Sequence, residues 1–282
     1  MNTFANPSAS TNALSDREFE FQPRDFARVR SLIYERAGIN LHEGKQAMVY
    51  SRLSRRLRET GHASFEAYLR DLEAGNQPQE WQEFVNCLTT NLTSFFREEH
   101  HFHALTEWLK ARGNQPTRIW CCAASTGEEP YSLAITCAEN MGLHASVKIL
   151  ATDIDTNVLA TASRGVYDAS ARGLNHVRMR NYFLKGKGSN DGSIRVKPEL
   201  ARMIEFRPFN LMSTSWQMGE AFDIVFCRNV MIYFDAPTQR KVLERIHAVM
   251  KPKGKLFVGH SENFTESRDL FLLRGKTIYD RV

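Results

Sequence analysis

The 282-residue sequence predicts an α/β protein with a doubly wound parallel sheet, preceded by a small all-helical domain. Two observations lead to this prediction. From residue 21 to about residue 86, apolar residues such as Phe26, Val29 and Ile33 recur at helical spacing, without an alternating β-branched run. From about residue 101 onward, apolar strand-like runs alternate with helical stretches, which is typical of parallel strands connected by helices.

The composition limits the class of protein. Hydrophobic residues make up 42% and charged residues 24%, as in ordinary globular chains. No apolar run approaches the roughly 20 residues of a membrane-spanning helix, so we expect no membrane insertion. Residues 1–20 lack the basic and apolar regions of a secretory signal, and we expect a disordered tail. The five cysteines form no CxxC pair, which favours a reducing cytoplasm and argues against a zinc site, so no metal is expected.

The elements follow in order. Gly38 and Gly61 are expected to end helices of the first domain, and residues 87–100 are a linker. The methyl-rich, apolar runs predict five strands: Arg118–Ala124, Val147–Thr152, Ile204–Arg207, Phe222–Cys227 and Lys255–Gly259. Helices are predicted between them at Glu129–Met141, Thr156–Arg164 and Pro237–Met250. At about residues 182–203, a glycine-rich turn between two short strands predicts an inserted antiparallel β-hairpin subdomain.

The residues after the strands indicate a nucleoside ligand, since ligands of open parallel sheets bind at the carboxyl ends of the strands. Asp153 follows the second strand, where a carboxylate accepts hydrogen bonds from two ribose hydroxyls. The first strand is followed by one glycine and by Glu128 and Glu129, which would repel the pyrophosphate of NAD. They suit the cationic amino acid end of S-adenosylmethionine. Each residue also has a structural alternative, with Asp153 or Asp155 as a helix cap and the glutamates complementing a helix dipole.

Five segments in order resemble one family: Thr90–Glu98 (TNLTSFFRE), Ala124–Ser132 (ASTGEEPYS), Asp153–Asp155 (DID), Phe226–Phe234 (FCRNVMIYF) and Gly259–Asn263 (GHSEN). They closely resemble the CheR family of chemotaxis-receptor methyltransferases, and the resemblance runs from about residue 22 to the C-terminus. It implies a Rossmann-like S-adenosylmethionine methyltransferase domain. It also implies protein-glutamate O-methyltransferase activity on the cytoplasmic helical domain of methyl-accepting chemoreceptors, with S-adenosylhomocysteine as the product.

The resemblance also implies site residues. The cofactor-binding residues at matching positions are Asn91, Thr93, Arg97, Glu129, Asp153, Asn210, Leu211, Arg228 and Asn229. Arg97 and Tyr233 are implied to lie beside the transferred methyl group. Because a glutamate side chain is already ionised at neutral pH, no general base is required. We therefore expect His100, His101 and His103 to be surface residues of a helix rather than catalytic ones.

Two surfaces are candidates for substrate binding. Arg52, Arg55 and Arg56 belong to a basic stretch without acidic residues that suits the acidic helices of a receptor, although a solvated helix face is the alternative. The hairpin is similar to a subdomain that binds a receptor C-terminal peptide in some family members, with a structural flap as the alternative. The matching positions are Lys185, Gly188, Gly192 and Arg195.

Two rival functions remain open at this point. One is a noncatalytic S-adenosylmethionine-binding signalling protein, against which Arg97 and Tyr233 count. The other is a nucleic-acid methyltransferase, for which the net charge of +5 is weak support, and no nucleic-acid partner is expected. A cytoplasmic monomer is expected.

Overall fold

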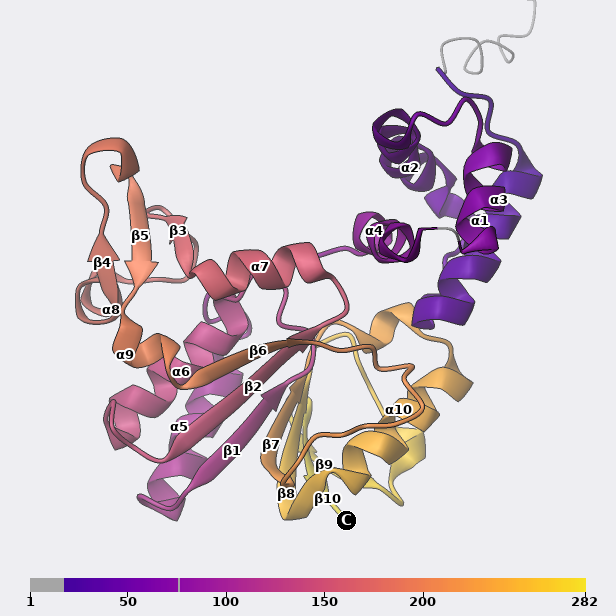
Figure 1. Ribbon diagram of the computed structural model, residues 1–282. Helices are drawn as coiled ribbons and strands as arrows, with labels where there is room; N and C mark the ends of the chain where they lie inside the picture. The colour runs from indigo at the N-terminus through magenta and orange to yellow at the C-terminus, as the bar shows by residue number, and fades with distance from the viewer. Residues whose placement is uncertain (1–17, 76) are drawn as a thin grey trace, which may run out of the picture.

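The N-terminal part of the protein is an independent helical layer in the computed structural model, which describes residues 18–75 and 77–282 (Figure 1). Its helices are α1 (Pro23–Ala37), α2 (Gln46–Thr60), α3 (Phe65–Ala74) and α4 (Pro78–Leu88). Val49, Leu53 and Phe65 are fully buried in a hydrophobic core of its own. Gly38 and Gly61 end α1 and α2 in left-handed conformation, as the sequence predicted. The tail predicted for residues 1–20 falls almost wholly outside the described residues.

The second part is a mixed sheet of seven strands, which confirms the predicted fold class. The strands are β1 (Thr117–Cys121), β2 (Val147–Asp153), β6 (Ile204–Pro208), β7 (Phe222–Cys227), β8 (Met250–Val258), β9 (Phe271–Gly275) and β10 (Ile278–Arg281). Their order is β6-β2-β1-β7-β8-β10-β9. The first five are parallel, whereas β10 pairs antiparallel to both of its neighbours. The order reverses between β1 and β7, and such a switch point is where ligands bind in open α/β sheets.

Helices cover both faces of this sheet, since alternate strand residues point to opposite sides. The helices are α5 (His100–Arg112), α6 (Glu128–Met141), α7 (Thr156–Arg164) and α10 (Ala236–Ala248). Apolar residues of α5 and α6 pack with Ile119 and Ile224 in one core. Those of α10 pack with Trp120 and Val225 in another. Figure 1 places α5 and α6 on the side of the sheet opposite α10. No helix of the described chain is long and apolar enough to span a membrane.

A second, antiparallel sheet projects from the first beside α7 (Figure 1). It consists of β3 (Val166–Asp168), β4 (Phe183–Lys185) and β5 (Ser193–Val196) in the order β3-β5-β4, with the short helices α8 (His176–Tyr182) and α9 (Pro198–Ala201). The pairing of β4 with β5 is the predicted hairpin. The sequence analysis missed β3, because three residues are too few to produce a recognisable alternation.

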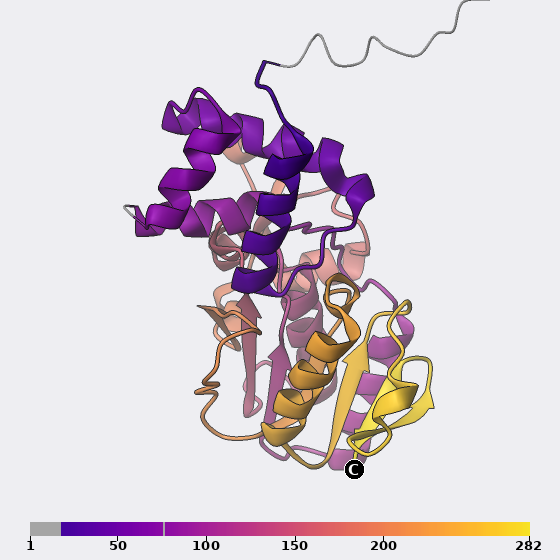
Figure 2. The same cartoon turned by 90° about the vertical axis from the view of Figure 1, so that its right-hand side faces the viewer.

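The helical layer contacts the carboxyl ends of the parallel strands through α1 and the residues after it. The backbone N–H of Asn40 donates to the Tyr233 carbonyl over 2.8 Å. The Asn210 side-chain amide donates to the Arg36 carbonyl over 2.7 Å. Figure 2 shows the helical layer lying above one end of the sheet. The end of α1 therefore covers the edge of the sheet where a ligand is expected.

Candidate functional site

A cavity of about 350 Å³ lies at the carboxyl ends of β1, β2 and β7. Four parts of the chain line it, namely these strand ends, the segment after β6, the linker after α4, and the segment between α1 and α2. Every cofactor-binding residue implied by the resemblance contributes to its wall: Asn91, Thr93, Arg97, Glu129, Asp153, Asn210, Leu211, Arg228 and Asn229. Tyr233 lines it as well. The fold thus brings together ten residues that are spread over 143 positions of the sequence, from 91 to 233.

Asp153 provides a buried carboxylate at the end of β2. One oxygen accepts a hydrogen bond from the Ser125 backbone N–H over 2.8 Å, and the other accepts from the Asp155 N–H over 2.9 Å. Burial raises the pKa of Asp153 to about 6, and these two backbone hydrogen bonds oppose the rise. Each oxygen keeps a further lone pair, so the carboxylate suits two neighbouring hydroxyls such as those of a ribose. Asp155 instead caps α7 by accepting from the Asn157 and Val158 N–H groups.

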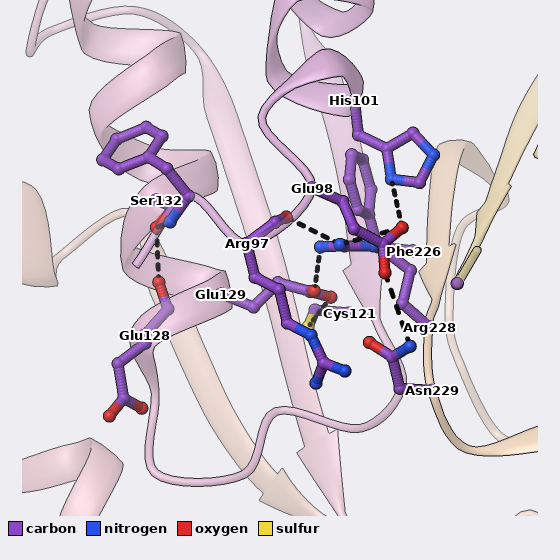
Figure 3. Close-up of polar contacts among 12 residues, drawn as sticks. Arg97, Glu98, His101, Cys121, Glu128, Glu129, Ser132, Phe226, Arg228 and Asn229 are labelled. Carbon is purple, nitrogen blue, oxygen red and sulfur yellow. Dashed lines mark hydrogen bonds and ion pairs between the residues drawn. The ribbon is translucent and has the colours of Figure 1, made fainter. Parts of the chain in front are cut away.

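Arg228 lies between two carboxylates in the floor of the cavity (Figure 3). Its side chain is fully buried and makes a 2.5 Å ion pair with Glu129 and a 3.3 Å ion pair with Glu98. It also donates to the Arg97 carbonyl over 2.6 Å. Burial raises the pKa of Glu98, but the charge of Arg228 and a hydrogen bond from His260 outweigh that effect and lower the pKa to about 2. The network fixes the linker backbone against the end of β7.

This network changes the charge argument made from the sequence. Glu129 lines the cavity, but Arg228 already neutralises it. Glu128 accepts a 2.6 Å hydrogen bond from the Thr126 hydroxyl and does not line the cavity. Gly127 is required for packing, since its φ is 101° and an added Cβ would lie 2.6 Å from the Tyr167 hydroxyl. The turn after β1 therefore determines the shape of the cavity wall and adds little net negative charge to it.

Arg97 and Tyr233 line the cavity, and most of their polar groups make no hydrogen bond or ion pair within the described residues. Arg97 donates to the Leu92 carbonyl over 2.9 Å, and no carboxylate of the described chain lies within ion-pair distance of its guanidinium. Tyr233 ends the short 3₁₀-helix Met231–Tyr233, and its hydroxyl has no hydrogen-bond partner in residues 18–75 and 77–282. Both groups are available for a bound molecule.

Glu262 positions one wall of the cavity, a role that the sequence analysis did not assign. Its carboxylate accepts hydrogen bonds from the backbone N–H groups of Asn229, Val230 and Met231, at 2.8–3.0 Å, and from Gly259. Asn229 has a φ of 58°, which is strained for a residue with a side chain. Four donors on one carboxylate hold this turn in place. Glu262 belongs to the GHSEN segment of the family resemblance, but three of its four partners lie about 30 residues upstream, and the sequence does not indicate that they are close.

The helical layer contributes a wall that the sequence analysis also missed. Ile39, Leu41 and Lys45 line the cavity.

Leu92 and Ile232 line it too, with 80% and 50% of their surface exposed. These two apolar side chains are the most exposed hydrophobic residues of the wall. They offer an apolar surface to a partner beside the cavity.

The basic residues of α2 lie outside the cavity, and two of the three predicted arginines have acidic partners, Glu59 and Glu80. Arg56 pairs with Glu80 at 2.5 Å, with 18% and 10% of their side chains exposed. Arg52 donates to the carbonyls of Cys87 and Thr89, and so caps the end of α4. The sequence did not indicate Glu80 or these carbonyls as partners, because they are distant along the chain. Arg55 alone of the three keeps a largely exposed side chain, at 77%.

The four predicted residues of the hairpin lie in the small sheet and not at the cavity. Lys185 and Arg195 are exposed on β4 and β5. Gly188 and Gly192 have φ values of 60° and 81° with open space around them. These glycines are required by the turn conformation rather than by a close neighbour.

The expectation of three surface histidines on α5 is wrong for His101. His103 is exposed, whereas His101 is fully buried and contacts Phe257 edge-to-face. Its Nε2 lies 3.1 Å from the Lys276 carbonyl, in the turn between β9 and β10. Burial, together with the charge of Arg228, lowers the pKa of His101 to about 4.

Comparisons with known proteins identify the family. The family model "CheR methyltransferase, SAM binding domain" matches residues 91–279, and "CheR methyltransferase, all-alpha domain" matches residues 24–89. The chemotaxis protein methyltransferase of Klebsiella aerogenes is 49% identical over 98% of this chain and 96% of its own length. That of Escherichia coli is 46% identical over 95% and 91%. Chemotaxis protein methyltransferase 2 of Pseudomonas aeruginosa is 46% identical over 96% and 98%.

The two matched ranges, residues 24–89 and 91–279, contain every residue that lines the cavity except Thr90. The Asp153 carboxylate, the Arg97 guanidinium without a carboxylate partner in the described residues, and the Tyr233 hydroxyl fit a nucleoside cofactor with an amino acid end. The chain therefore belongs to the CheR methyltransferase family, and its cofactor is S-adenosylmethionine.

Proposed function

We propose that this protein methyl-esterifies glutamate side chains on the cytoplasmic helical domain of bacterial chemoreceptors, as a monomer in the cytoplasm. The observation that carries the proposal is Arg97, a cation in the cavity wall without a carboxylate partner in the described chain. A substrate carboxylate supplies the missing partner. The exposed Leu92 and Ile232 beside it suit the apolar side chains that flank a glutamate on an amphipathic helix.

The chemistry requires positioning rather than a base. Bound S-adenosylmethionine supplies a methyl group on a positively charged sulfur. The glutamate substrate is ionised at neutral pH and is already nucleophilic. In our proposal Arg97 orients its carboxylate, Tyr233 donates a hydrogen bond to it, and Asp153 holds the ribose. Orientation of this kind is worth about 7–11 kcal/mol in intramolecular reactions.

The carboxylates of the cavity are consistent with this division of roles. Glu129 is neutralised by Arg228, and Asp153 is held by two backbone N–H groups. In our proposal the remaining lone pairs of Asp153 accept from the ribose hydroxyls, so neither carboxylate is placed to remove a proton from a substrate hydroxyl or amine. This favours a substrate that needs no deprotonation, which a carboxylate satisfies and a nucleobase amine does not.

The test uses a receptor cytoplasmic fragment and S-adenosylmethionine with a labelled methyl group. We expect label that is released as methanol in mild alkali, because only carboxyl methyl esters hydrolyse under those conditions. Arg97→Ala and Tyr233→Phe should lower kcat more than they raise KM for the receptor, since positioning acts at the transition state. Alkali-stable label would exclude glutamate as the acceptor. Wild-type turnover by both variants at saturating cofactor would refute the assigned roles.

Receptor binding is proposed to use the exposed cations of α2. Because Arg52 and Arg56 are half-buried by their contacts, the more exposed Arg55 and Arg58 are the better candidates, with ion pairs to Glu59 and Glu18 that lie at the surface. Exposed ion pairs contribute about 0.2–1 kcal/mol each, so the charge reversals must be combined. Arg55→Glu with Arg58→Glu should raise KM for the receptor at low salt and leave cofactor affinity unchanged. Arg70→Glu, on the exposed face of α3, is the matched control.

The small sheet is proposed to bind the C-terminal peptide of a receptor by adding a strand at the open edge of β4. The backbone N–H of Lys197 donates to the Tyr182 carbonyl, and the N–H of Gly186 donates to the Ser193 carbonyl. In an antiparallel pair, every second residue makes these hydrogen bonds, so the N–H and C=O of Lys185 point away from β5. Peptides from the receptors of the same organism should bind at micromolar concentration and lose affinity in Arg195→Ala, but not in Arg180→Ala. If no receptor tail binds, the sheet has only a structural role.

A further inference from the structure

Three buried side-chain atoms at the start of α5 lie close together and make no hydrogen bond within the described residues. They are Glu98 Oε2, His100 Nε2 and His101 Nδ1, of which Glu98 Oε2 has Arg228 as an ion-pair partner at 3.3 Å. All three lie within 4.8 Å of one another. His101 is fully buried, and the Glu98 side chain is 10% exposed. A buried polar atom without a hydrogen bond is costly, so these atoms together point to a bound species.

The tautomer of His101 determines what kind of species fits. Its Nε2 faces the Lys276 carbonyl, which only accepts hydrogen bonds, so the ring proton is assigned to Nε2. The lone pair of Nδ1 then faces Glu98 Oε2 at 3.6 Å. Two lone pairs that face each other repel, and a positive ion between them removes the repulsion. A histidine that ligates a metal through one ring nitrogen also commonly donates the N–H of its other ring nitrogen to a backbone carbonyl, as Nε2 of His101 does here.

The local charge also favours a cation. Glu98 and Glu129 carry two negative charges, and the buried Arg228 between them carries one positive charge. The cluster therefore retains one negative charge. Arg228 hydrogen-bonds to Glu129 and to the Arg97 carbonyl and lies 3.3 Å from Glu98 Oε2 on the side of the cavity, so the histidines face this oxygen together with Arg228.

We propose that Glu98, His100 and His101 bind a divalent transition metal ion, with zinc as the best match. Two imidazole nitrogens and one carboxylate oxygen are a common zinc ligand set, with a water as fourth ligand. Ligand bonds of about 2.1 Å in a tetrahedron place the ligand atoms about 3.4 Å apart, close to the 3.6 Å between His101 Nδ1 and Glu98 Oε2. This revises the expectation of no metal, which rested on cysteine spacing.

The ion connects parts of the chain that are distant in sequence. Glu98 contacts Arg228 at the cavity, and His101 contacts the turn between β9 and β10 at Lys276. Bound metal therefore fixes the linker that carries Arg97 relative to the C-terminal strands. Its expected effect is on stability and on the order of the linker, and the methyl transfer itself does not involve it.

The test is direct metal binding by the full chain, purified with a tag that contains no histidine. After exposure to zinc and dialysis, we expect about one zinc per chain by elemental analysis, and a rise in Tm on adding zinc to the metal-free protein. Cobalt in the same site should give visible absorption bands of a tetrahedral ion. His100→Ala should lose the bound zinc, the cobalt bands and the Tm response. His103→Ala, an exposed histidine on the same helix, is the matched control and should keep all three.

Two results would overturn the proposal. One is a wild-type protein that retains no zinc and gives no tetrahedral cobalt spectrum, which would mean that the three atoms share a water molecule. The other is unchanged zinc and cobalt binding in His100→Ala, which would place the ion elsewhere. Because His100 is only half-buried and its Nε2 makes no hydrogen bond within the described residues, its replacement should not prevent folding.

Discussion

Replacement of Asp153 provides the sharpest test of the cofactor site. Asp153→Asn keeps the shape of the side chain, but its NH₂ group must face one of the two backbone N–H groups that the carboxylate now accepts. The variant also loses the charged acceptor for two hydroxyls. Hydrogen bonds to a charged group contribute about 1.5–3 kcal/mol, so the Kd for S-adenosylhomocysteine should rise roughly 10- to 150-fold. Isothermal titration calorimetry measures this, with circular dichroism to verify that the variant is folded.

The pH dependence of the same affinity follows from the raised pKa of Asp153. In the free protein this carboxyl takes up a proton as the pH falls through about 6. Hydroxyl donors favour the ionised form, so binding must expel that proton at lower pH. Affinity should therefore be flat near pH 7 and fall below pH 6, approaching tenfold per pH unit. The slope should vanish in Asp153→Asn and persist in His42→Gln, which replaces the histidine of the cavity wall. Unchanged affinity and slope in Asp153→Asn would refute the assigned role.

Two further predictions concern stability. Arg56→Ala should lower the free energy of unfolding by about 1–3 kcal/mol in urea titrations, because it leaves the buried Glu80 without its cation, whereas Arg55→Ala should change it by less than about 0.5 kcal/mol. Equal effects of the two would contradict the burial argument. Gly173→Ala should cost at least ~2 kcal/mol, since its φ is 90° and the new Cβ would lie 1.8 Å from a backbone carbonyl oxygen, while Gly61→Ala, at φ 74° in open space, should cost about 1 kcal/mol.

The sequence predicted the parts of this protein that depend on local pattern. Asp153 was assigned correctly to the cavity wall because a strand end and its ligand edge follow from the strand itself. The helical wall at Ile39 was missed, since nothing local indicates which surface of the first domain contacts the sheet. His101 was misplaced for the same reason, because the turn that buries it lies 175 residues further along the chain. The ion pair of Arg56 with Glu80 could not be predicted either, because Glu80 belongs to a different helix.

The cavity lies between the helical layer and the sheet, each of which has a hydrophobic core of its own. A cofactor bound there would contact both parts and hold them together. The direct polar contacts between the two layers include the Asn40–Tyr233 and Asn210–Arg36 hydrogen bonds. A ligand that contacts both layers adds its own binding free energy to their association, which at a hundredfold excess over Kd is about 2.7 kcal/mol. The layer that carries Arg55 is then held more firmly when the methyl donor is abundant. Supply of the donor in the cell would therefore regulate how rigidly the protein presents its basic helix.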